Sequence, residues 1–122
     1  MPDCVDFGII PNIEYNKNYA DYGREPYKTV YAKYNCISVP DDFVNDWISL
    51  TYNIPTYVCS LDRKYMGIDH WGITIIPPES VKLLLDIVRS YMEKNPDESI
   101  KKLAELLNTA IDNGKYVICN GL

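Results

Sequence analysis

Two long helical patterns in succession, over residues 77–94 and 96–113, constrain the fold of this chain more than any other feature. In the first, one apolar stripe is widened on its flank by a second set of apolar side chains: Val81, Leu84, Leu85, Val88 and Met92, then Leu83, Ile87 and Tyr91. The second repeats apolar side chains at helical spacing: Ile100, Leu103, Ala104, Leu107 and Ile111. Because such wide apolar faces have to be buried, the sequence predicts a helix pair packed against a sheet.

The predicted helix pair lies between two segments with the composition of strands. Residues 71–76 are almost continuously apolar and predict a central strand, and residues 116–119 predict a final strand after the helix cap Gly114. Asn95 in front of Pro96 is expected to be the N-cap residue of the second helix. An antiparallel helix pair returns the chain to the level where the first strand ended, so the two strands are expected to run antiparallel.

The first half of the chain predicts shorter elements. Strands are expected over residues 4–10, 27–39 and 57–59, and a helix over residues 40–51, where a proline and two aspartates precede apolar residues at helical spacing. We therefore predict one α+β domain over residues 1–122. Its mixed or antiparallel sheet has four or five strands, with the C-terminal helix pair packed on one face and the further helix, near residues 40–51, elsewhere.

The charge of the chain narrows the choice of partners. With 12 Lys and Arg against 17 Asp and Glu, the net charge is -5, and the lysines are scattered along the sequence. Binding to nucleic acid needs clustered basic residues, so nucleic acid is not expected as a partner. An acidic domain is instead attracted to basic proteins and repelled by anionic membranes.

Neither a membrane span nor a metal or cofactor site is expected. No segment approaches the roughly 18 apolar residues of a membrane span, and the first residues carry acids where a signal peptide carries positive charge. We therefore expect a cytoplasmic protein. Cys4, Cys36, Cys59 and Cys119 form no C-x-x-C pair and lie beside apolar stretches, so reduced and mostly buried thiols are expected. No spacing of residues matches a calcium loop or a zinc site.

The one histidine, His70, is the candidate for acid/base chemistry, because histidine is the side chain that ordinarily titrates near physiological pH. It lies between Asp69 and Trp71, where a loop enters the predicted central strand. A carboxylate next to it in sequence points to the opposite face of a strand, so an orienting group has to come from elsewhere, with Asp62, Asp41 or a tyrosine as candidates. The catalytic hypothesis takes His70 as the acid/base group, assisted by Asp69, Asp62 or a tyrosine.

Tyrosine is the unusual component of the composition, with 11 Tyr against 2 Phe and 2 Trp. Six tyrosines lie in the N-terminal third, interleaved with Asn, Asp and Glu: Tyr15, Tyr19, Tyr22, Tyr27, Tyr31 and Tyr34. Tyrosine is enriched where proteins recognise other molecules, although a small sheet protein with few phenylalanines also uses it as half-buried filler. The leading hypothesis is an acidic interaction domain that binds a basic protein through these tyrosines, such as an inhibitor or immunity-type protein.

Two other functions remain open. A small enzyme or ligand-binding domain would have its pocket near His70, although the sequence favours a binding role over a catalytic one and predicts no cofactor. An oligomerising structural subunit would instead expose the flanking apolar residues of the helix over residues 79–94 at an interface between copies.

Overall fold

A computed structural model describes residues 4–12, 31–59, 61 and 63–121 of the chain. In chain order its elements are β1 (Cys4–Ile10), β2 (Ile37–Pro40), α2 (Asp41–Trp47), the 3₁₀ helix η2 (Ile48–Asn53), β3 (Pro55–Val58), β4 (Lys64–Met66), β5 (Ile73–Ile76), α3 (Pro78–Lys94), α4 (Glu98–Asp112) and β6 (Tyr116–Asn120). The strands form one sheet in the order β2-β1-β6-β5-β3-β4, and all neighbouring pairs are antiparallel. The predicted α+β class is confirmed, and the sheet is antiparallel rather than mixed.

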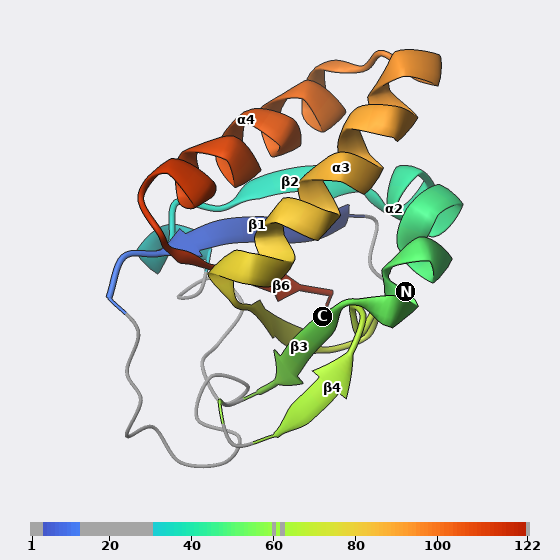
Figure 1. Ribbon diagram of the computed structural model, residues 1–122. Coiled ribbons are helices and arrows are strands. Elements are labelled where there is room, and N and C mark those ends of the chain that lie inside the picture. The colour runs from blue at the N-terminus through green and yellow to red at the C-terminus, as the bar shows by residue number, and fades with distance from the viewer. Residues whose placement is uncertain (1–3, 13–30, 60, 62, 122) are drawn as a thin grey trace.

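The last strand, β6, lies inside the sheet between β1 and β5 (Figure 1). Cys119 of β6 is opposite Phe7 of β1 on one side and opposite Thr74 of β5 on the other. The two strands that flank the helix pair, β5 and β6, run antiparallel as predicted. The first and last strands of the described chain are therefore direct neighbours in the sheet.

The predicted number of four or five strands is too low, because the sheet formed by the described residues has six. The strand that the sequence does not reveal is β4, whose residues Lys64, Tyr65 and Met66 are all exposed at the edge of the sheet beside β3. An exposed edge strand has no buried face and needs no alternation of apolar residues. The polar residues 62–64 consequently predict a turn at this place.

Both long helices cover the same face of the sheet, as predicted, and α2 lies beside them (Figure 1). Side chains at alternate strand positions, among them Val5, Phe7 and Val117, pack with the apolar stripes of α3 and α4 in one cluster. Trp47 of α2 is buried in the same cluster, with its ring centroid 6.4 Å from that of Phe7. The larger part of the core therefore lies between the sheet and the helices.

The ends of the two long helices follow from local sequence. Pro78 begins α3. Proline lacks a backbone N–H, but the first N–H groups of a helix have no acceptor within the helix, so nothing is lost there. Asp97 caps α4, because its carboxylate accepts a hydrogen bond from the backbone N–H of Ser99 at 2.9 Å. The predicted cap, Asn95, is therefore wrong by two residues. Gly114 ends α4 as predicted, with a φ of 63° in the left-handed region that favours glycine.

The opposite face of the sheet is covered in part by the segment that leads into β2. Residues 31–33 are helical, and the strand begins only with β2. A Cβ on Gly8 would lie 2.7 Å from the sulfur of Cys36 and 2.8 Å from Cβ of Tyr34, so these side chains pack directly over β1. The predicted strand over residues 27–39 is therefore wrong in its middle, because the chain there crosses the second face of the sheet. The first four residues of that prediction lie outside the described part of the chain.

The four cysteines are thiols, and the predicted burial is found for Cys36 and Cys119. Cys59 is half-buried, and Cys4 is exposed, contrary to the prediction. Burial, together with the negative charge of nearby Asp6, raises the pKa of Cys36 to about 12 and also raises the pKa of Cys119, so both thiols are protonated at neutral pH.

In the described ranges, no three His, Cys, Asp or Glu side chains gather around a possible metal ion. Within the same ranges, no helix combines the length and apolar character needed to cross a membrane.

Candidate functional site

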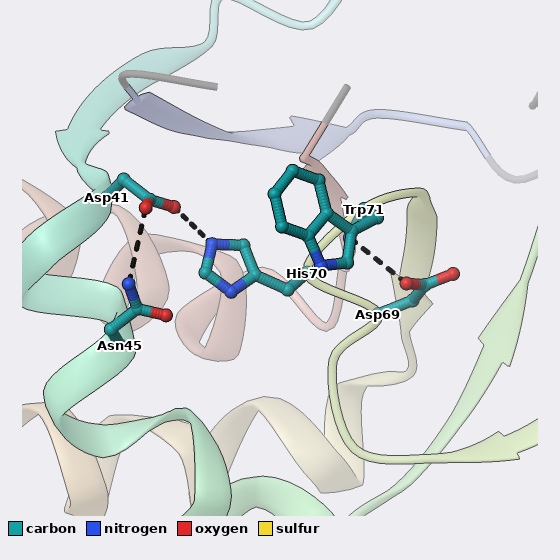
Figure 2. Close-up of polar contacts among 5 residues, drawn as sticks. All are labelled: Asp41, Asn45, Asp69, His70 and Trp71. Atoms are coloured by element: carbon teal, nitrogen blue, oxygen red, sulfur yellow. Dashed lines mark hydrogen bonds and ion pairs between the residues drawn. The ribbon is translucent and has the colours of Figure 1, made fainter. Parts of the chain in front are cut away.

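His70 lies in the connection between β4 and β5, and its imidazole points toward the first residue of α2 (Figure 2). Its Nε2 contacts Oδ1 of Asp41, and the other oxygen of Asp41 accepts a hydrogen bond from Nδ2 of Asn45 at 3.3 Å. The side chains of His70 and Asp41 are only 14% and 5% exposed. The contact therefore joins an acid and a base that are largely withdrawn from water.

Local sequence places both partners of this contact. Asp41 directly follows β2, which delivers its carboxylate to the N-terminus of α2, where negative charge is favourable. On the other side, Gly67 has a φ of 86° and turns the chain out of β4. The backbone N–H of Gly121 then donates to the carbonyl of Gly72 at 2.9 Å. These contacts hold the His70 connection against the end of β6.

Asp69, the first carboxylate predicted to assist His70, has a different role. Asp69 accepts a hydrogen bond from the backbone N–H of Trp71 at 3.0 Å, and its own N–H donates to Oγ1 of Thr74 at 2.9 Å. Asp69 thus shapes the turn before β5 and is not the carboxylate that orients the imidazole. Asp62 lies outside the described residues. Asp41, the third carboxylate considered from the sequence, is the one that His70 contacts.

Trp71 stacks on the imidazole of His70, with ring centroids 5.4 Å apart and planes inclined by 21°. It is 58% exposed and lies in the turn before β5, so the strand predicted from residue 71 begins only at Ile73. Among the described residues, no group hydrogen-bonds to the second ring nitrogen of His70, Nδ1. An oriented imidazole with a free nitrogen can exchange a proton with a ligand, although no described thiol or hydroxyl is bonded to it as a nucleophile.

A second feature is a groove of about 390 Å³ between α2–η2 and α3, here called the α2–α3 groove. Its lining residues come from both walls: Asp46, Trp47, Leu50, Asp86, Ile87, Ser90, Tyr91 and Lys94. The hydroxyl of Tyr91 joins the walls by donating to Oδ2 of Asp46 at 2.7 Å. Partial burial, this hydrogen bond and the negative charges of Asp46 and Asp97 raise the pKa of Tyr91 to about 12.

The α2–α3 groove combines apolar and acidic side chains. Trp47 is buried and Ile87 is half-buried, whereas Asp46 and Asp86 are exposed. Leu50, at 62%, is the most exposed large apolar side chain of the described residues. The indole N–H of Trp47 is buried and has no hydrogen-bond partner among those residues. The groove thus offers an apolar surface with carboxylates on both of its walls.

Two of the six tyrosines predicted to bind a partner fall within the described ranges. Tyr31 is exposed, whereas Tyr34 is buried on the second face of the sheet, so the ring of Tyr34 is not accessible to a partner. The other four lie outside the described ranges: Tyr15, Tyr19, Tyr22 and Tyr27. Tyr52 of η2 and Tyr65 of β4 are exposed tyrosines that composition did not single out.

Comparison with protein families, with curated proteins and with solved structures found no match. Function therefore has to be inferred from the residues themselves. The sequence did not reveal the α2–α3 groove, because Asp46 and Tyr91 are 45 residues apart and form no local motif. The one sequence feature that pointed to this groove was the widened apolar flank of α3, which includes Leu83, Ile87 and Tyr91.

Proposed function

We propose that this chain is an interaction domain that binds a basic protein partner, in the manner of an inhibitor or immunity-type protein. The observation that supports the proposal is the exposure of large apolar side chains on an acidic chain. Within the described ranges these are Tyr31, Leu50, Tyr52, Tyr65, Met66, Trp71 and Leu83. With a net charge of -5, the domain attracts a basic protein by charge and offers it aromatic and aliphatic contacts.

Two of these side chains, Leu50 and Tyr52, lie on the short helix η2. This short helix contacts both α3 and β4. Leu50 of η2 lines the α2–α3 groove together with Ile87 of α3. A Cβ on Gly67, the residue directly after β4, would lie 2.9 Å from the ring of Tyr52, so Tyr52 adjoins the end of that strand. Exposed apolar side chains near one another are typical of interaction sites.

The proposal is tested by capturing partners from a lysate of the native cell with tagged protein, at about 0.15 M salt and again at higher salt. We expect one basic protein in near-stoichiometric amount, with less at higher salt because screening weakens charge attraction. The combined variant Tyr15→Ala, Tyr19→Ala and Tyr22→Ala should bind the partner more weakly while its monomer stays folded. Absence of a partner at both salt concentrations would contradict the proposal.

If the chain is an inhibitor or immunity-type protein, it should also inhibit the captured partner. One equivalent of this chain should abolish whatever enzymatic or toxic activity the partner has alone. A partner that stays fully active in the complex would restrict the proposal to binding without inhibition.

A second candidate function, an acid/base site for a small ligand, is favoured by the contact between His70 and Asp41. The contact orients the imidazole, leaves Nδ1 without a partner among the described residues and places it beside the exposed ring of Trp71. We would screen small-molecule fragments while following the NMR signals of both rings. A ligand that shifts both signals and is lost in folded His70→Ala supports this candidate, and unchanged binding in that variant removes it.

A further inference from the structure

We infer that the α2–α3 groove binds a short amphipathic helix of the partner, in which basic residues flank the apolar side chains. The inference rests on the proposed function, because it names the surface and the kind of segment through which a basic partner is held. It places this contact in the groove, separately from the tyrosines of the N-terminal third.

The walls of the groove suit a helix. The α3 wall runs from residue 86 to residue 94, a length of about 12 Å at a rise of about 1.5 Å per residue, or about two helical turns. On the opposite wall, Asp46 and Trp47 at the end of α2 and Leu50 of η2 line the groove. A third helix fits between two helical walls by placing its side-chain ridge in the groove that they form.

The charge around the groove favours a basic occupant. Residues 41–53, which form α2 and η2, include three aspartates and no Lys or Arg. Asp46 on this wall and Asp86 on the α3 wall are both exposed. Among the lining residues only Lys94, at the end of α3, is basic. Lysine or arginine side chains on the two flanks of a docked helix would therefore meet a carboxylate on each wall.

The hydrogen bond from Tyr91 leaves Asp46 able to bind a partner. It occupies one of the two carboxylate oxygens, Oδ2, and it is exposed to solvent. A carboxylate accepts several hydrogen bonds, so an incoming lysine or arginine can bind Asp46 while Tyr91 stays in place. The ring of Tyr91, which also contacts the ring of Phe43 with centroids 6.3 Å apart, then remains part of the apolar wall.

The test uses a defined peptide as its probe. It is a capped synthetic peptide of about 18 residues, with leucine at helical spacing and lysine elsewhere, which exceeds the length at which isolated helices are marginal. A control peptide keeps the leucines and replaces every lysine with glutamate. Binding to the full ¹⁵N-labelled chain is followed by NMR, with the indole N–H signal of Trp47 as the reporter. We expect the lysine peptide to shift this signal and the glutamate peptide to leave it unchanged.

Charge-matched variants separate the groove from the overall charge. Asp46→Asn with Asp86→Asn removes two charges from the groove, and Glu105→Gln with Asp112→Asn removes two charges from exposed positions of α4, which does not line it. We expect binding of the lysine peptide to weaken about tenfold in the first variant and less than about twofold in the second. Leu50→Ala, at an exposed position, should weaken it about threefold. Equal weakening by the two double variants would overturn the inference.

The same variants distinguish this inference from the proposed function. If both double variants retain a native basic partner equally well, the proposed function stands and the groove is not its contact surface. If no partner is captured, the proposed function fails, and the peptide titration alone decides whether the groove binds a basic helix. Occupation of the groove by a second copy of the chain would appear as a dimer in analytical ultracentrifugation that Leu50→Ala dissociates, and it would overturn the inference.

Discussion

Two of the three carboxylates of helix α2, Asp41 at its first residue and Asp46 near its end, lie in opposite surroundings. Asp41 is buried and contacts His70, which is 29 residues away in the chain. Asp46 is exposed and accepts a hydrogen bond from Tyr91 of α3. Each carboxylate therefore has a partner from a distant segment, and the two contacts differ mainly in their access to water.

This difference in burial decides what each contact can do. When one partner of a buried acid–base contact is removed, the other is left without compensation in surroundings of low dielectric constant. When an exposed contact loses a partner, water replaces it, so the contact adds little stability and is easily exchanged. We therefore assign Asp41 to holding the connection between β4 and β5, and Asp46 to the groove where a partner can bind.

The largest effect is expected from breaking the buried contact. His70→Ala should lower the free energy of unfolding by about 3 kcal/mol, because it leaves the carboxylate of Asp41 buried without its basic partner. Urea unfolding followed by circular dichroism measures this loss. Trp71→Ala removes the exposed ring that stacks on His70 and is the control, with an expected cost below about 1 kcal/mol. Equal stability of His70→Ala and the parent protein would show that the contact does not support the fold.

The next-largest effect is expected from a substitution of Gly121, which follows β6 and lies against the backbone of His70. A Cβ at this position would collide with the backbone carbonyl of His70. Gly121→Ala should therefore cost about 2 kcal/mol and shift the NMR signals of the His70 ring. In the control Gly114→Ala no atom lies within 4 Å of the new Cβ, so only the positive φ is strained, at about 1 kcal/mol. If the NMR signals of the His70 ring are unchanged in Gly121→Ala, the end of β6 does not help to position the contact between His70 and Asp41.

The helix pair could be predicted from the sequence because α3 and α4 repeat their apolar residues over several turns, and because Pro78 begins α3 and Gly114 ends α4. The edge strand β4 could not, because its three exposed residues carry no apolar alternation. Nor could the path of residues 31–36, which cover Gly8 on the second face of the sheet. That placement is decided by packing between distant segments, which overrides local strand propensity.

In the candidate site, too, contacts between distant segments could not be predicted from local sequence. His70 could be chosen from the sequence because it is the one histidine, but its partner could not be chosen among several carboxylates. Its sequence neighbour Asp69 binds the backbone of its own turn, and Asp41 reaches the imidazole only because the fold brings the start of α2 to the connection between β4 and β5 (Figure 2). The widened apolar flank of α3 did indicate a further contact surface, but not that α2 and η2 would form its other wall.

A smaller effect is expected from breaking the exposed contact. Tyr91→Phe removes the hydroxyl that donates to Asp46 and should lower the free energy of unfolding by about 0.5 kcal/mol, because water can hydrogen-bond to the freed carboxylate. The same urea measurement applies, with Tyr65→Phe on β4 as the control at another exposed tyrosine. A loss above about 2 kcal/mol would show that the contact of Asp46 stabilises the fold as strongly as that of Asp41. Asp46 could then not easily exchange its contact with Tyr91 for one with a partner.

The smallest effect concerns the titration of Tyr91, whose pKa is raised to about 12 by partial burial, by the hydrogen bond to Asp46 and by the charges of Asp46 and Asp97. Asp46→Asn should lower this pKa, because the phenolate would no longer form beside that carboxylate. Since the folded-state pKa lies above the ordinary value of 10.0, the contact stabilises the fold below about pH 10 and loses this effect as the pH rises toward about 12. The ¹³C signal of the Tyr91 ring measures the pKa, with Asp86→Asn as the control. An unchanged pKa in Asp46→Asn would mean that burial and the charge of Asp97 raise it without Asp46. It would also mean that the interaction between Tyr91 and Asp46 is weaker than the comparison with Asp41 requires.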